Sequence, residues 1–279
     1  MFKYLAATLT LIFLGLSGIY FLVGVPRIEK TNFPRATLAH LYNNPDVSIA
    51  NIHIFAFYFV PKNKSADISQ DWGSTIASGL DNLKRFHELQ LQKRSQISYK
   101  IFPEPVIGEH DSIFYNTENT DRGNPFALIN ISKELQKRVF NESGDLYLEE
   151  FKKSSPDDYP VIFVMYEGVG STGGIINESE KETATDIARE FNLPESVIFI
   201  VDVEAAHGFF LVNKEIITGR HGPNGQSIMA HEFYHTIGLP DKYSLKDGVA
   251  NSADIMGLGR FKLIENTYLS KELLAGLGL

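Results

Sequence analysis

Four short runs in the chain, made mostly of apolar residues, have the length and composition of β-strands. Each run is rich in β-branched and aromatic residues, and the first two stop at proline. The last two runs are typical of central strands, which are covered on both faces of a sheet. The predicted strands cover residues 51–60, 97–102, 161–166 and 196–203.

Segments with helical periodicity separate these predicted strands. Across residues 71–94, apolar side chains recur every three or four positions, which is the spacing of one face of an amphipathic helix. Shorter helices are predicted over residues 131–140 and 180–191, and surface loops over the polar stretch 111–124 and the glycine-rich stretch 168–174. Because strand and helix alternate, the sequence favours an α/β fold with a largely parallel sheet and a single core.

The first thirty residues contain a hydrophobic segment of a different kind. Residues 4–25 include no charged side chain, and basic residues flank them on both sides. About 20 apolar residues suffice to span a bilayer as a helix, and this run is longer than the apolar region of a cleaved signal peptide. We therefore predict a transmembrane signal anchor over residues 1–30 and an extracytoplasmic domain over residues 31–279. A cleaved signal, which would give a secreted protein, is the alternative.

Composition narrows the classes of function. The chain of 279 residues has a formal net charge of −8 at pH 7. This argues against a nucleic-acid-binding surface, because contacts to phosphates need clustered lysine and arginine. The chain has no cysteine, which excludes disulfides, thiolate metal ligands and cysteine nucleophiles. Any zinc site must therefore be built from nitrogen and oxygen ligands.

One short stretch near the C-terminus has the residues of a metal site. His231 and His235 are four positions apart, so on a helix both imidazoles lie on one face and can bind the same ion. Gly238 can end this helix, and the turn that follows brings Asp241 back toward the ion. Glu232 follows the first histidine, which places its carboxylate beside the ion as a general base toward water. These residues predict a zinc ion held by His231, His235 and Asp241, with the fourth position open for catalysis.

This stretch, HEFYHTIGLPDKY, resembles the active-site motif of the metzincin-type zinc peptidases whose third ligand is aspartate. It is similar to the motifs of the immune inhibitor A family and of the snapalysin-type peptidases. Those families have a methionine turn shortly after the motif, and Met256 in SADIMGLG stands at the matching place. The resemblance spans residues 230–259. It implies a zincin/metzincin-like catalytic domain with a mixed sheet, an active-site helix and a Met-turn.

The same resemblance implies an endopeptidase that uses one Zn²⁺ ion and takes a protein or peptide as its substrate. Tyr243 lies two residues after Asp241, where its phenol could donate a hydrogen bond to the oxyanion of the reaction intermediate. His221 is the reserve metal ligand if Asp241 does not bind.

Two other functions use similar residues. Two histidines and one carboxylate also form the facial triad of non-haem iron oxygenases, although such a site does not need Glu232. A catalytically silent, membrane-anchored binding module could keep zinc for its stability alone. Replacement of Glu232 separates a hydrolase from the iron enzyme. Binding of a hydroxamate at an exchangeable coordination position separates a hydrolase from the silent module.

Overall fold

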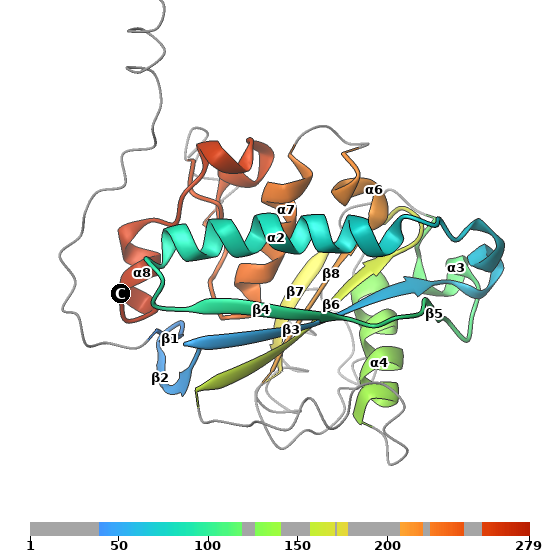
Figure 1. Cartoon of the computed structure of the whole chain (residues 1–279), viewed down its shortest axis with the longest axis horizontal. Helices are drawn as coiled ribbons and strands as arrows, with labels where there is room; N and C mark the ends of the chain where they lie inside the picture. The colour runs from blue at the N-terminus through green and yellow to red at the C-terminus, as the bar shows by residue number, and fades with distance from the viewer. Residues whose placement is uncertain are drawn as a thin grey trace, which may run out of the picture. The chain divides into compact units, whose positions relative to one another are not determined.

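The computed structural model describes residues 39–118, 126–140, 157–170, 172–177, 207–219, 224–242 and 253–279 (Figure 1). All of these residues belong to the unit Ala36–Leu279. Within them, no helix combines the length and the apolar character that crossing a membrane requires. Residues 4–25 lie outside the described part of the chain, so the signal anchor stays a prediction.

A mixed six-stranded sheet forms the centre of this unit. Its strands are β3 (Asn51–Val60), β4 (Gln96–Ile101), β5 (Val106–Ile107), β6 (Asp158–Tyr166), β7 (Gly173–Asn177) and β8 (His207–Asn213). Four strands are parallel and lie in the spatial order β4, β3, β6 and β8, and the strand β7 beside β8 runs antiparallel to it. The short β5 continues the parallel pairing along the end of β3. The fold is therefore a mixed α/β fold, as the alternation of predicted strands and helices favours.

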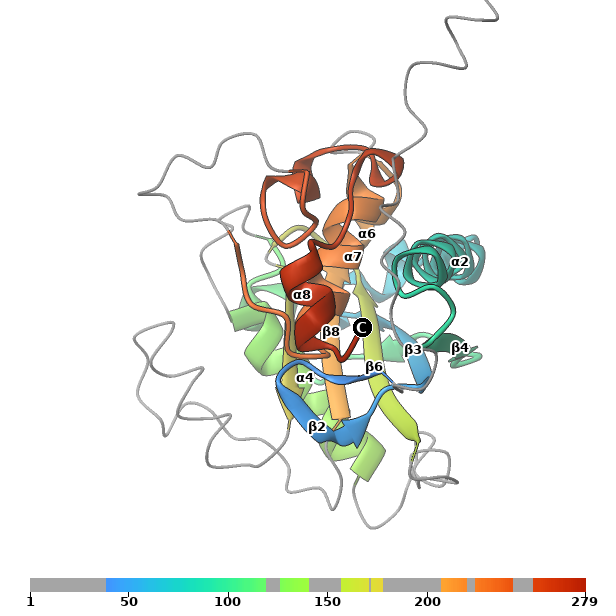
Figure 2. The ribbon, with the colours of Figure 1, turned by 90° about the vertical axis from the view of Figure 1, so that its left-hand side faces the viewer.

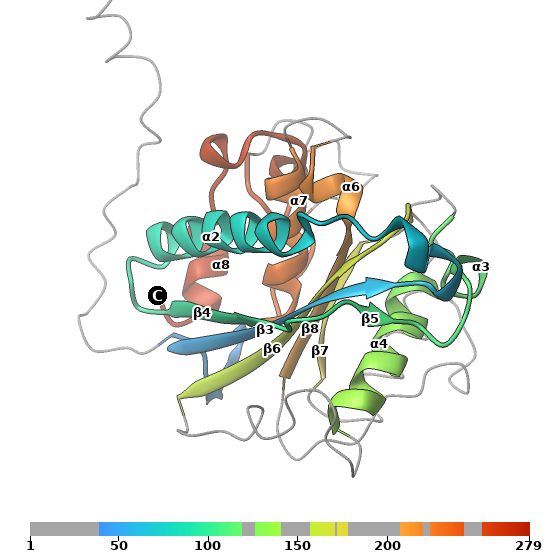
Figure 3. The ribbon, with the colours of Figure 1, turned by 45° about the vertical axis from the view of Figure 1, so that its right-hand side comes forward.

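Helices cover both faces of this sheet. Helix α4 (Phe126–Phe140) lies on one face, and α2 (Trp72–Gln90) and α7 (Gly225–His235) lie on the other (Figures 1 and 3). A strand that is covered on both faces can bury every side chain, and all nine residues of β6 are buried. This explains why the central strands are continuous apolar runs in the sequence and do not alternate with polar residues.

The side chains of the central strands alternate between two cores. On one face, Phe57 of β3 and Leu135 of α4 belong to the same buried cluster. On the other face, the rings of Phe163 and Phe210 stack with their centroids 4.6 Å apart. Phe233 of α7 meets Phe210 edge-on at a centroid distance of 5.8 Å. The second core therefore fixes α7, the helix that carries the candidate metal ligands, on the sheet.

A hairpin near the start of the described chain packs beside the C-terminal helix. Strands β1 (His40–Leu41) and β2 (Asn44–Ser48) pair antiparallel, and β2 lies next to α8 (Lys271–Gly276) (Figure 2). The amide of Tyr42, in the turn of this hairpin, donates to the carbonyl of Ile237 at 3.0 Å. The hairpin therefore also supports the turn that follows α7. The remaining short helices are η1 (Lys62–Asp67), α3 (Ser112–Tyr115), α6 (Lys214–Ile217), η4 (Leu258–Phe261) and η5 (Ile264–Asn266).

Most predicted elements within the described residues are confirmed, and all but the first strand have shifted ends. The strands predicted at 51–60, 97–102 and 161–166 correspond to β3, β4 and β6, and the helix predicted at 71–94 is α2. The helix predicted at 131–140 is α4, which begins five residues earlier. The helix predicted at 180–191 and the strand predicted at 196–203 lie outside the described residues.

The two loop predictions are wrong in part. Gly173 and Gly174, at the end of the stretch predicted as a loop, belong to the edge strand β7, because pairing with β8 supplies hydrogen bonds that their composition does not indicate. Within the predicted loop 111–124, residues 112–115 form the short helix α3. Strand β8 is absent from the predicted elements because its apolar run, FFLV, is only four residues long.

Gly174 allows α7 to lie directly against the edge of the sheet. A β-carbon at this position would stand 1.9 Å from the carbonyl oxygen of Glu232, far inside van der Waals contact. The obstacle is backbone and cannot rotate away, so any larger residue must push the strand and the helix apart.

Gly174→Ala should therefore lower the free energy of unfolding by about 1–3 kcal/mol, the usual cost of overpacking. Urea unfolding of the two proteins measures this difference. Gly73→Ala is the matched control, because a β-carbon there meets no atom within 4 Å and lies in the first turn of α2. That control should unfold at the same or a slightly higher urea concentration than the wild type. Equal stability of Gly174→Ala and the wild type would contradict the close approach.

A buried imidazole links α2 to α7. His87 has no exposed surface, its Nε2 lies 2.8 Å from the hydroxyl of Ser95, and its ring stacks on Tyr234 at a centroid distance of 6.0 Å. Burial disfavours the charged imidazolium and lowers the pKa of His87 to about 3. The ring of His87 therefore stays neutral in the folded protein as the pH falls through 6.5, where the same ring becomes protonated in the unfolded chain.

Acid should destabilise the protein through His87. Between pH 6.5, the ordinary pKa, and about 3, the unfolded chain binds a proton at His87 that the folded chain does not. The free energy of unfolding should therefore fall as pH is lowered through this window, by up to about 1.4 kcal/mol per pH unit from this residue. Urea unfolding of metal-free wild type and His87→Gln at several pH values measures it. The variant should show the smaller slope, and identical slopes would contradict this role of His87.

Candidate metal centre

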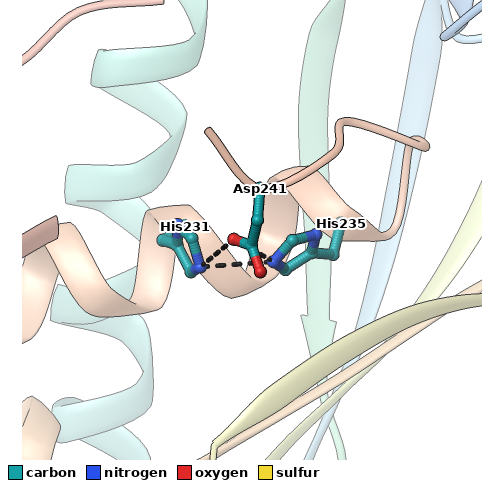
Figure 4. Close-up of side chains that lie close together, drawn as sticks. All are labelled: His231, His235 and Asp241. Atoms are coloured by element: carbon teal, nitrogen blue, oxygen red, sulfur yellow. Dashed lines mark hydrogen bonds and ion pairs between the residues drawn. The ribbon is translucent and has the colours of Figure 1, made fainter. Parts of the chain in front are cut away.

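Helix α7 presents two imidazoles that face one another. Its buried residues Ala230, Phe233 and Tyr234 anchor the helix in the fold. His231 and His235 are one turn apart, and their rings stand nearly perpendicular with centroids 4.7 Å apart (Figure 4). The helical spacing predicted from the sequence is thus the spacing in the structure.

Backbone carbonyls orient both rings. Nδ1 of His231 lies 2.9 Å from the carbonyl oxygen of Ile255, and Nδ1 of His235 lies 2.9 Å from that of Leu239. Since a carbonyl oxygen can only accept, the neutral form of each ring carries its proton on Nδ1 and keeps a lone pair on Nε2. The two Nε2 atoms lie 3.2 Å apart. Metal-binding histidines are usually held in this way, with the second ring nitrogen donating to a carbonyl or carboxylate.

A turn after α7 brings Asp241 to the same place. Helix α7 ends at His235, and Gly238 has a φ of 89°, in the left-handed region that favours glycine. The chain then reverses, and Oδ1 of Asp241 lies 3.2 Å from Nε2 of His231 and 3.4 Å from Nε2 of His235. The role predicted for Gly238 in turning the chain is confirmed.

The three ligand atoms have the separations of a tetrahedral zinc site. Zinc binds imidazole nitrogen and carboxylate oxygen at about 2.0–2.2 Å, and tetrahedral angles then place ligand atoms about 3.3–3.6 Å apart, close to the separations seen here. The observed separations are 3.2, 3.2 and 3.4 Å. Within the described parts of the chain, no other cluster of His, Asp and Glu side chains has a comparable arrangement. His231, His235 and Asp241 therefore fit one zinc ion.

The charges in this group favour a negative Asp241. Burial would raise the pKa of Asp241, but hydrogen bonds and charge interactions with His231 and His235 hold it well below the usual range. Burial would lower the pKa of His235, but its hydrogen bond to Asp241 and the charges of Glu232 and Asp241 raise it. A proton therefore competes with a metal for His235, and the affinity for metal should increase with pH.

Glu232 is buried on α7, directly after the candidate ligand His231. Its Oε1 accepts a hydrogen bond of 2.6 Å from the hydroxyl of Thr172. Thr172 directly precedes the edge strand β7, so this strand orients a carboxylate that α7 supplies. The carboxylate is close enough to contribute to the raised pKa of His235. Glu232 is therefore placed to accept a proton next to the ligands.

Removal of the Thr172 hydroxyl should impair any reaction in which Glu232 acts as a base. Thr172→Val keeps the shape of the side chain but loses the hydrogen bond to the carboxylate, and hydrogen bonds to charged groups contribute about 1.5–3 kcal/mol. We expect kcat to fall about 10-fold while bound metal stays unchanged. Thr172→Ser keeps the hydroxyl and should retain most activity. Equal activities of the Val and Ser variants would show that this hydrogen bond does not hold the base.

The segment around Met256 supports two of the ligands from outside α7. Ile255 provides the carbonyl that orients His231. Met256 is fully buried, and its carbonyl accepts a hydrogen bond of 2.8 Å from the amide of Lys242, the residue that follows Asp241. Met256 therefore lies in the part of the chain that positions the candidate metal centre. The Met-turn itself stays a prediction.

Sequence reasoning missed two side chains near this centre. Thr172 lies in a stretch predicted as a loop, and the guanidinium Nη1 of Arg260 lies 3.3 Å from Nε2 of His231. Both come from segments that approach α7 only in the folded chain, so no local pattern marks them. Tyr243 and His221 lie outside the described residues, and their roles stay predictions.

Comparison with known proteins does not assign this chain to a family. No protein-family model matches this chain, and no curated protein shows significant similarity to it. The case for a function therefore depends on the geometry of the centre and on the sequence motif.

Proposed function

We propose that this protein is a zinc-dependent endopeptidase, in which His231, His235 and Asp241 hold one Zn²⁺ ion and Glu232 is the general base. The observation that carries the proposal is the spacing of the three ligand atoms, 3.2–3.4 Å, which fits tetrahedral zinc. Orientation of both histidines by backbone carbonyls supports it further.

The chemistry divides between the ion and the protein. Bound zinc supplies Lewis acidity, which polarises the scissile carbonyl and lowers the pKa of the attacking water. Glu232 takes the proton from that water and then passes it to the leaving amine. Thr172 holds one oxygen of the carboxylate, so the other is available for these transfers. Tyr243 is a further candidate, as a hydrogen-bond donor to the oxyanion.

The motif further suggests a relation to the metzincin-type peptidases. The order of elements along the chain is compatible with that fold. The strands of the mixed sheet and helix α2 come first, the helix with the candidate ligands follows, and the buried Met256 comes after it. We also propose, from residues 4–25, that the catalytic domain is anchored in a membrane by a single helix and faces the extracytoplasmic side.

The position of Glu232 favours a hydrolase over the two alternatives. An iron oxygenase with a facial triad has no use for a buried carboxylate that a threonine holds beside the ligands. A silent binding module that keeps zinc for stability has none either. A buried carboxylate is costly to retain, so a catalytic role for Glu232 explains its presence better.

Cleavage of casein and of a peptide library by the detergent-solubilised full-length chain tests the proposal. We expect cleavage that 1,10-phenanthroline abolishes and that zinc restores. Restoration of cleavage by ferrous iron alone would show that iron, and not zinc, is the metal of the hydrolase. Stoichiometric zinc without cleavage of any peptide would favour the silent module. Cleavage that the chelator leaves unchanged would refute a metal-dependent mechanism.

A further inference from the structure

Asp241 is held in the fold differently from the two histidines. His231 and His235 belong to α7, and their side chains are only 1% and 21% exposed. Asp241 comes after the end of that helix, and 33% of its side chain is exposed. A turn at the surface can shift while the core stays folded, because local movements cost less than global unfolding. Contacts at the ends of the turn must therefore set the place of this ligand.

Lys242, the residue after Asp241, fastens one end of the turn to the C-terminal helix. Its Nζ donates to Oγ of Ser270 at 2.9 Å and forms an ion pair with Glu272 at 2.5 Å. Ser270 directly precedes α8, and Glu272 lies in the first turn of that helix. The same lysine also donates its amide to the carbonyl of Met256, so both its backbone and its side chain are held.

Helix α8 is itself fixed by the hairpin of β1 and β2 (Figure 2). The amide of Asn43 donates to the carbonyl of Gly276 at 2.8 Å, and a β-carbon on Gly276 would stand 2.1 Å from the ring of Tyr42. The amide of Tyr42 donates to the carbonyl of Ile237, at the other end of the turn. The hairpin and α8 therefore form one support that holds the turn on both sides of Asp241.

We propose that Lys242 is a positioning residue, which keeps Asp241 where it can bind zinc by fastening the turn to α8. The inference rests on the metal centre of the proposed function and adds to it a contact that regulates the affinity for zinc from outside the ligands. Without this contact, Asp241 leaves the histidines for part of the time. The apparent affinity then falls in proportion to the fraction of chains that keep the binding arrangement.

The test measures the zinc affinity of full-length Lys242→Gln. We expect the affinity to fall about 3–10-fold, near the lower limit for residues that orient a metal ligand. Competition with a chromogenic chelator measures the tight forms, and calorimetry measures the weak ones. Lys62→Gln is the matched control, because it makes the same change at an exposed lysine of η1 and should keep wild-type affinity. An ion pair at the surface adds little to folding, so the urea midpoint of zinc-free Lys242→Gln should hardly change.

A second background shows whether Lys242 acts through Asp241. In Asp241→Ala, which lacks the ligand that Lys242 positions, Lys242→Gln should cause no further loss of affinity. Exchange of the two charges tests the partner on α8. Lys242→Glu alone should weaken zinc binding, and Lys242→Glu combined with Glu272→Lys should recover most of the affinity.

Three results would count against the proposal. If Lys242→Gln binds zinc as tightly as the wild type, the contact does not hold Asp241. If the loss is equal in the wild-type and Asp241→Ala backgrounds, Lys242 acts on the fold in general. If the exchanged pair recovers no affinity, the ion pair with Glu272 is not the contact that matters.

Failure of the proposed function gives different results. A wild type that binds no zinc would refute the metal centre, and this inference would fall with it. A wild type that binds zinc and cleaves no peptide would refute only the peptidase, because the affinities measured here do not depend on cleavage.

Discussion

Glu232→Gln should lower kcat for peptide hydrolysis by about 10²–10⁴-fold, the usual contribution of a general base. Glutamine keeps the shape of the side chain and can still accept the hydrogen bond from Thr172, but it cannot take a proton from water. The three ligand residues are untouched, so the variant should bind as much zinc as the wild type. The change should therefore separate catalysis from metal binding.

Steady-state kinetics and elemental analysis of the same preparations measure both quantities. Glu104→Gln is the matched control, because it makes the same chemical change at an exposed carboxylate outside the centre. It should behave as the wild type. A Glu232→Gln protein that retains full activity would contradict the role of Glu232 as base. One that loses its zinc would show that Glu232 supports the metal centre.

His235→Ala should lose zinc almost completely after dialysis, and with it all peptidase activity. Changes to residues that only orient a metal ligand already weaken affinity about 10–100-fold, so removal of a ligand should cost more than 100-fold. The Nε2 of His235 lies within 3.4 Å of both partner ligand atoms, so no other part of the described centre replaces it without rearrangement.

Competition with a chromogenic zinc chelator measures this loss of affinity. His110→Ala removes an exposed histidine outside the centre and should leave zinc affinity unchanged. Circular dichroism shows whether each variant is folded. If folded His235→Ala keeps wild-type affinity, the ion is bound elsewhere, and the assignment of the three ligands is wrong.

The elements that could be predicted from the sequence are those with a strong local pattern. A ten-residue stretch that is apolar from residue 54 to residue 60 predicts β3 with its observed bounds, because a strand covered on both faces buries successive side chains. The edge strand β7 carries no such pattern. It begins with two glycines, of which Gly174 lets α7 lie against the strand, and its pairing with β8 cannot be inferred from either segment alone.

The candidate centre likewise combines residues that a local sequence pattern marks with residues that it does not mark. His231, Glu232 and His235 lie within five residues of one helix, so helical geometry alone brings them together. Asp241 follows through a glycine turn that the sequence also marks. Thr172 and Arg260 reach the centre from the edge of the sheet and from η4. Their places depend on how separate segments pack, and single residues of these types occur throughout the chain.

X-ray absorption at the zinc K-edge, on the full-length chain loaded with one equivalent of zinc, identifies the atoms that bind the ion. We expect only nitrogen and oxygen ligands, at about 2.0–2.2 Å, with the multiple scattering of two imidazoles and a coordination number near four. Zinc surrounded by six oxygens, with no imidazole scattering, would contradict the claim that His231, His235 and Asp241 form the metal centre.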